Sequence, residues 1–128
     1  MAERITNIST GVVRLKTRPQ FVYVRGGKSE RRKSLVVQAR TNRHRGAQVG
    51  AGFTATKKVG NAVTRNRAKR RLRAAAQTLL PACGQPGVDY VFIARKDTAT
   101  IGWPRLLDDM ESALISLANQ LPAGAGSA

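Results

Sequence analysis

The sequence predicts an α+β domain built as a two-layer sandwich, with three helices packed on a small mixed sheet. Three short runs of β-branched, aromatic and small residues have the length and composition of strands. Two long segments carry apolar residues every three to four positions, which is the spacing of amphipathic helices. At 128 residues, with a single cysteine at Cys83, the chain is long enough to bury one core without disulfides.

The first half of the chain is expected to supply a short helix and then two strands. Residues 1–17 look loosely structured. Residues 18–29 ("RPQFVYVRGGKS") predict a short helix, because a proline suits its first turn and a glycine pair suits its end. Residues 33–39 ("KSLVVQA") predict a strand, and the turn-rich, basic residues 41–48 predict a loop. Residues 49–56 ("VGAGFTAT") predict a half-buried strand whose glycines indicate a bulge or the close approach of another backbone.

The second half is expected to supply a long helix, a strand and a last helix. The long helix is predicted over residues 62–80, with Asn61 as its N-cap and Pro81 at its end. Residues 88–95 ("VDYVFIAR") are apolar on both faces, which predicts a central strand. Residues 100–121 predict an amphipathic helix. Its apolar stripe consists of Trp103, Leu106, Leu107, Met110, Leu114, Leu117 and Leu121.

Charge is the strongest functional signal in the composition. The net charge is +16, and it is unevenly placed. Residues 1–80 hold 20 Lys and Arg against two acidic residues, a net of +18, whereas residues 81–128 have a net of −2. Such segregation indicates a polyanionic partner, for which nucleic acid is the commonest choice and an anionic membrane the competitor. No apolar run reaches the length of a signal peptide core or of a membrane span, so we expect a soluble, intracellular protein.

The cations gather on the predicted long helix, in "AVTRNRAKRRLR" from Ala62 to Arg73. At about 100° per residue, Ala68 and Leu72 share an apolar face, while Arg70 lies on the opposite face. The helix should therefore bind the protein on one side and present a strip of cations on the other. Arginine outnumbers lysine in this strip, which favours bidentate contacts with phosphate.

No residue set in the sequence points to catalysis by protein side chains. His44, the single histidine, lies in a turn between two arginines, where a phosphate contact or plain exposure is expected. Three aspartates, Asp97, Asp108 and Asp109, lie close in sequence, but two of them fall in the first turns of a helix, where acidic residues are favoured by the helix dipole. We therefore expect no metal site in the protein.

Two stretches resemble a known family. "TKKVGNAVTRNRAKRRLRAAAQ" (residues 56–77), followed by "DYVFIARKDTA" (residues 89–99), resembles the bacterial ribonuclease P protein subunit, whose signature "RNR" stands here at residues 65–67. The resemblance extends more weakly over "RLKTRPQF" and the first two strands. It covers residues 14–121, which leaves residues 1–13 as a flexible segment and residues 122–128 as a disordered tail.

The resemblance implies a function and a fold. In this family the catalyst is an RNA subunit with bound Mg²⁺, and the ribonucleoprotein removes the 5′ leader from precursor tRNA in the bacterial cytoplasm. The protein would thus be part of an endoribonuclease whose chemistry its own side chains do not perform. The family fold has a left-handed βαβ crossover through the long helix, against the usual right-handed rule. Gly60, just before that helix, is where we expect unusual backbone geometry.

The resemblance also assigns two RNA-binding surfaces. Contacts to the catalytic RNA fall on Lys57, Lys58, Asn61, Arg65, Asn66, Arg67, Lys69, Arg70 and Arg73. A cleft between the first helix and the sheet would hold the single-stranded leader, with Phe21 stacking on a base. Where family members often have a second aromatic this chain has Arg25, and where some have a strand tyrosine it has Gln38. The cleft is therefore expected to depend more on charge than on stacking.

Other classes of protein compete with this interpretation. A general RNA-binding or ribosomal structural protein would share the basic helix, but would have no effect on leader cleavage. A nucleoid protein that binds DNA is less favoured, because no helix-turn-helix pattern is present. A peripheral membrane protein is least favoured, since the basic helix pairs its charges with alanine and not with the large apolar residues that enter membranes.

Overall fold

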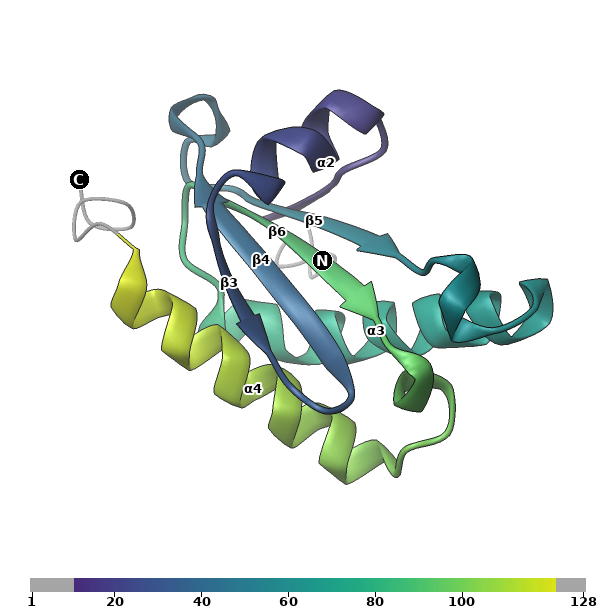
Figure 1. Ribbon diagram of the computed structural model, residues 1–128. Coiled ribbons are helices and arrows are strands. Elements are labelled where there is room, and N and C mark those ends of the chain that lie inside the picture. The colour runs from purple at the N-terminus through teal and green to yellow at the C-terminus, as the bar shows by residue number, and fades with distance from the viewer. Residues whose placement is uncertain (1–10, 122–128) are drawn as a thin grey trace, which may run out of the picture.

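The computed structural model describes residues 11–121, which form a five-stranded sheet with three α-helices (Figure 1). The strands are β2 Val12–Arg14, β3 Lys28–Arg31, β4 Leu35–Thr41, β5 Val49–Thr54 and β6 Val88–Ala94. The α-helices are α2 Arg18–Arg25, α3 Ala62–Cys83 and α4 Trp103–Gln120. Three 3₁₀ turns are η1 Arg43–Arg45, η2 Lys57–Val59 and η3 Lys96–Ala99.

The sheet is mixed, with the strand order β2-β5-β6-β4-β3. β5 pairs in parallel with β2 and β6, whereas β4 pairs antiparallel with β6 and β3. The long helix α3 connects the neighbouring parallel strands β5 and β6, as a βαβ unit requires. Three α-helices on a mixed sheet confirm the predicted α+β class.

The helices cover the sheet unequally, with α3 and α4 on one face and the short α2 on the other (Figure 1). The main core lies under α3 and α4 and includes Tyr90, Phe92, Leu72 and Leu114, all fully buried. A smaller cluster lies under α2. β6 is buried on both faces and is the middle strand, as its two-sided apolar sequence predicted. Because β6 is central and apolar on both faces, it packs against the α3 and α4 side with one face and against the α2 side with the other.

Both edge strands were missed by the sequence analysis. β2 lies within residues 1–17, which were expected to be loosely structured, and that expectation is wrong at Val12–Arg14. β3 has the polar sequence KSER and is mostly exposed. β2 is only three residues long and β3 is polar, so neither carries the alternating apolar pattern by which a strand is predicted. The expectations for residues 1–10 and 122–128 lie outside the described residues.

Two helix boundaries also differ from the prediction. α3 continues through Pro81 to Cys83, because a proline in the last, exposed turn removes only one backbone hydrogen bond. The last helix begins at Trp103, not at Thr100, since η3 and a short bend precede it. Trp103 itself is 37% exposed and does not belong to the buried stripe in which it was placed.

The glycines of β5 make room for side chains, whereas the sequence suggested a bulge or a neighbouring backbone. A Cβ atom added to Gly52 would lie 2.7 Å from Cζ of Phe21, and one added to Gly50 would lie 2.2 Å from Oδ1 of Asp89. The strand is regular and is buried from Val49 to Gly52. Its glycines thus let α2 and a buried carboxylate approach the sheet closely.

Candidate nucleic-acid interface

α3 buries the apolar face that its sequence predicted and turns most, but not all, of its cations away from the core. Ala68 and Leu72 are fully buried against the sheet, while Asn66, Arg67 and Arg70 are exposed. Arg65, Lys69 and Arg73 are half-buried at the borders of this surface. We call the exposed and bordering side chains the basic strip, which consists of Arg65, Asn66, Arg67, Lys69, Arg70 and Arg73.

The segment before α3 is shaped by a cap and a glycine. The Asn61 side-chain oxygen accepts a hydrogen bond from the backbone N–H of Thr64 at 2.9 Å. Asn61 is therefore the N-cap of α3, as the sequence predicted. Gly60 has φ 148°, in the region that favours glycine, which confirms the expected unusual backbone. This turn places the exposed Lys57 and Lys58 next to the start of the basic strip.

One cation of the run from Arg65 to Arg73 is turned toward the protein. Arg71 donates hydrogen bonds from Nη1 to the Thr98 carbonyl and from Nη2 to the Ile101 carbonyl, both at 2.6 Å. Its guanidinium also lies 5.9 Å from the ring centroid of Trp103. Arg71 therefore fixes η3 and the start of α4 against α3, and it does not belong to the basic strip.

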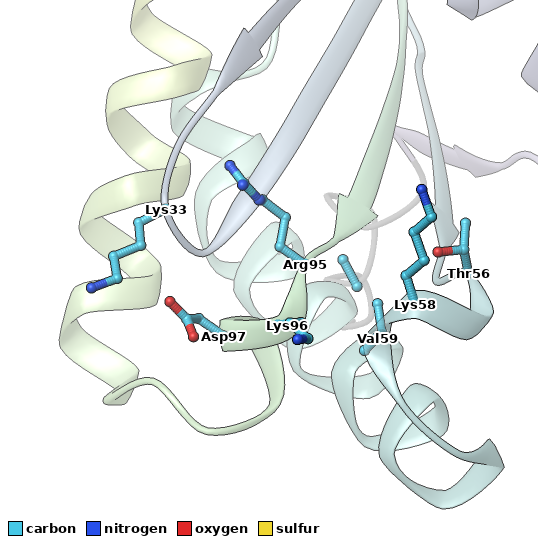
Figure 2. A pocket seen from close by; sticks show the side chains of 8 residues that line it. Lys33, Thr56, Lys58, Val59, Arg95, Lys96 and Asp97 are labelled. Atoms are coloured by element: carbon cyan, nitrogen blue, oxygen red, sulfur yellow. The ribbon is translucent and has the colours of Figure 1, made fainter.

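A basic pocket adjoins the basic strip where the parallel strands β5 and β6 end (Figure 2). The cavity measures about 780 Å³ and is lined by Lys33, Thr56, Lys58, Val59, Ala94, Arg95, Lys96 and Asp97. Figure 2 shows Lys58 and Thr56 on one side of it, Lys33 and Asp97 on the other, and Arg95 and Lys96 between them. Four cations against one carboxylate give this pocket a net positive charge, which favours anions. Of these four cations only Lys58 was predicted from the sequence, because the other three are brought to it by the tertiary fold.

Buried hydrogen bonds fix the backbone of this pocket. The Ser34 hydroxyl donates to Oδ2 of Asp109 at 2.8 Å, and the Thr98 hydroxyl donates to the Ser34 carbonyl. The backbone N–H of Arg95 donates to the Thr98 hydroxyl at 2.8 Å. Burial by itself raises the pKa of Asp109, but the hydrogen bonds from Ser34 and Arg105 outweigh it and lower the pKa below its ordinary value. Asp109 is thus a charged anchor for the turn that carries Lys33.

The second predicted surface lies on the opposite face of the sheet, beside α2. Phe21 is half-buried, packs with the cluster of Leu15, Val24 and Val91, and lies over Gly52. Gln38 is half-buried on β4 and is paired across the sheet with Val91 of β6. Phe21 and Gln38 therefore share one face, with the middle strand between them.

Arg25 and Tyr23 complete the α2 end of this face. Arg25 is exposed in the last turn of α2. Tyr23 was not singled out in the sequence, yet it is 38% exposed and its hydroxyl donates to the Thr41 carbonyl. The Arg40 guanidinium lies 4.2 Å from the Tyr23 ring centroid and donates to the Tyr23 carbonyl. The aromatic–arginine pair was missed because its partners are 17 residues apart.

Within residues 11–121, no three His, Cys, Asp or Glu side chains come together in a way that could hold a metal ion. The described helices include none that is long and apolar enough to span a membrane.

The fold and the surface together define a class: a small α+β protein that offers a polyanion an arginine-rich helix and an adjoining basic pocket. The family described as Ribonuclease P matches residues 11–118 of the chain. The chain belongs to the bacterial ribonuclease P protein component family, and is thus a protein subunit of ribonuclease P, the endoribonuclease that processes the 5′ ends of tRNA.

Similar proteins agree in sequence and in structure. The ribonuclease P protein component of Caulobacter vibrioides is 50% identical over 111 residues, which cover 87% of this chain and 74% of that protein. The component from Ruegeria pomeroyi is 48% identical over 112 residues, which cover 85% of this chain and 89% of that protein. The RNase P protein from Thermotoga maritima has 25% identity and a TM-score of 0.68, covering 81% of this chain and 96% of the other.

Proposed function

We propose that this protein binds the catalytic RNA of ribonuclease P through the basic strip together with Lys57, Lys58 and Asn61, and binds the 5′ leader of precursor tRNA on the α2 face of the sheet. The observation that carries the proposal is that the basic pocket adjoins both surfaces. Lys58 precedes α3 and lines the pocket. Such a subunit works in the bacterial cytoplasm, where precursor tRNA is made.

The register of the sheet supports a path for the leader. Gly52, Val91, Gln38 and Ser29 are paired in one row across the sheet, and Phe21 lies over the first of them. The next row on the same face consists of Thr54, Ile93, Val36 and Arg31. Thr56 lies two residues beyond the end of β5 and Arg95 comes directly after β6, and both line the basic pocket. A single-stranded RNA leader could thus pass from the Phe21 ring, across the sheet, to the cations of the basic pocket.

We infer that Mg²⁺ is held by the RNA, because the described carboxylates do not gather into a metal site. The protein contributes positive charge between two RNA molecules that repel each other. Since both bound cations and Mg²⁺ reduce this repulsion, the protein should lower the Mg²⁺ concentration that cleavage requires.

Cleavage of a 5′ leader tests this role directly. We expect the catalytic RNA alone to cleave precursor tRNA poorly at low Mg²⁺ and the added protein to restore cleavage, with a much smaller gain at high Mg²⁺. The rate of leader release is measured at both concentrations, with and without the protein. If the protein gave no gain at low Mg²⁺ yet bound unrelated RNAs equally well, a general RNA-binding function would replace the proposal.

Phe21 should serve leader binding and not assembly. Phe21→Ala removes the ring over Gly52. We expect the affinity for precursor tRNA to fall about tenfold, because base stacking on an aromatic contributes about 1–3 kcal/mol. The affinity for the catalytic RNA should be unchanged. Phe21→Leu, which keeps an apolar side chain in the cluster, should show the same loss without unfolding. Val22→Ala, at a 44% exposed position on α2, is the matched control. Equal losses in both binding assays would contradict two separate surfaces.

A further inference from the structure

The single tryptophan occupies an unusual position for an amphipathic helix. Trp103 begins α4 and is 37% exposed, whereas Leu106, Met110 and Leu114 of the same helix are fully buried. The sequence periodicity places Trp103 with these residues, yet the fold leaves part of its ring in solvent. Tryptophan is enriched at interfaces, because its ring is largely apolar and its N–H is polar, so a partly exposed tryptophan is a candidate contact residue.

The Trp103 ring is held in place by a fixed cation. Arg71 lies 5.9 Å from the ring centroid, and its two hydrogen bonds to the Thr98 and Ile101 carbonyls fix the guanidinium. Pro104 restricts the backbone directly after the ring. A ring held this way loses little conformational entropy when a second flat group stacks on it.

The surroundings of the ring are basic. Arg67 lies one helical turn before Arg71 on α3 and is exposed, and Lys96 is exposed on η3, which packs against α3 (Figure 1). Arg105 is 59% exposed although it pairs with Asp109. Asp97 of η3 is the carboxylate on this side, and the remaining carboxylates of α4, Asp108 and Glu111, lie one turn or more farther along the helix. An aromatic ring that contacts one arginine, in a region where cations outnumber carboxylates, fits a nucleobase attached to phosphates better than it fits an apolar protein.

We propose that Trp103 stacks on an unpaired base of the catalytic RNA, beside the phosphates bound by the basic strip. This inference rests on the proposed function. The catalytic RNA is the partner, and not the leader, because Trp103 lies with α3 and α4 on one face of the sheet, whereas the predicted leader surface lies with α2 on the other. Unpaired bases in loops and bulges are the parts of RNA that aromatic side chains recognise.

Because Trp103 is the only tryptophan, its fluorescence reports on this position alone. We expect titration of the full chain with the catalytic RNA to quench the emission and to protect it from acrylamide, and a leader oligonucleotide alone to do neither. Trp103→Ala should weaken binding of the catalytic RNA about tenfold, the size of one lost stacking contact. Trp103→Phe should recover most of this loss. The slope of log affinity against log salt should be unchanged in both variants, because no phosphate contact is removed.

Ile115→Ala is the matched control, since Ile115 is a 52% exposed apolar residue on the same helix. Unchanged acrylamide access in the complex, or equal affinity of Trp103→Ala and wild type, would overturn the stacking. Quenching by the leader oligonucleotide alone would assign the ring to the leader and also overturn it. These failures are distinct from failure of the proposed function, in which the wild-type chain itself would not bind the catalytic RNA.

Discussion

Replacing Arg67 and Arg70 together by alanine is expected to weaken binding of the catalytic RNA about a hundredfold. Both side chains are exposed on the basic strip, so their loss should leave the core intact, and in the proposed function both contact phosphates of the catalytic RNA. A hydrogen bond to a charged group contributes about 1.5 kcal/mol, and two of them correspond to about two factors of ten in affinity. The slope of log affinity against log salt should also become shallower by about 1.5, since two phosphates are no longer neutralised.

The measurement is equilibrium binding of the catalytic RNA over a range of salt concentrations. Arg31→Ala with Arg43→Ala is the control, because it removes the same charge from exposed positions on β3 and η1. Melting temperatures of both double variants should match the wild type, as exposed substitutions change stability little. If the control pair lowered affinity and slope equally, binding would depend on total charge, and the basic strip would not be a specific surface.

The parts of the fold with strong local signals were predictable from the sequence. The N-cap at Asn61, the buried Ala68 and Leu72 and the two-sided burial of β6 each follow from residue type and spacing. β3 could not be predicted in this way, because its residues pair only with β4 and carry no apolar alternation. Pairing with β4, and not local β-propensity, therefore determines the structure of β3.

The candidate site shows the same division. The basic strip lies on one helix, so a 3.6-residue period is enough to find it. The basic pocket combines Lys33, Lys58, Arg95 and Lys96 from three separate segments, which are brought together by the parallel pairing of β5 with β6 and the antiparallel pairing of β4 with β6. Arg71 was counted with a run of cations, although the carbonyls that bind it lie 27 and 30 residues farther along the chain. Helical periodicity gives the face of a residue but not the partner that it meets there.

Asp89 is expected to be the most sensitive charged residue for stability. Its Oδ1 accepts a hydrogen bond from Nε of Arg45 at 2.7 Å, and its Oδ2 accepts bonds from Nη2 of Arg45 at 3.2 Å and from Asn42 at 2.9 Å. The two charged side chains are only 2% and 14% exposed, for Asp89 and Arg45 respectively. Asp89→Ala leaves a largely buried guanidinium without its counter-charge, and we expect a loss of about 3 kcal/mol. For a domain of this size the melting temperature should fall by about 10 °C.

Asp108→Ala is the control for this measurement, because it removes the same charge from an exposed position on α4. Asp108→Ala measures how much stability is lost when the net positive charge rises by one, and this loss should be small. Arg45→Ala should also destabilise, and the double variant should lose less than the sum of the two, since each single change orphans the partner. Below its melting temperature, Asp89→Ala should still bind the catalytic RNA as wild type does, because the pair ties η1 to β6 and the basic strip lies on α3. If Asp89→Ala melted no lower than Asp108→Ala, the pair would contribute nothing to the fold, and the close packing of Gly50 against its carboxylate would need another explanation.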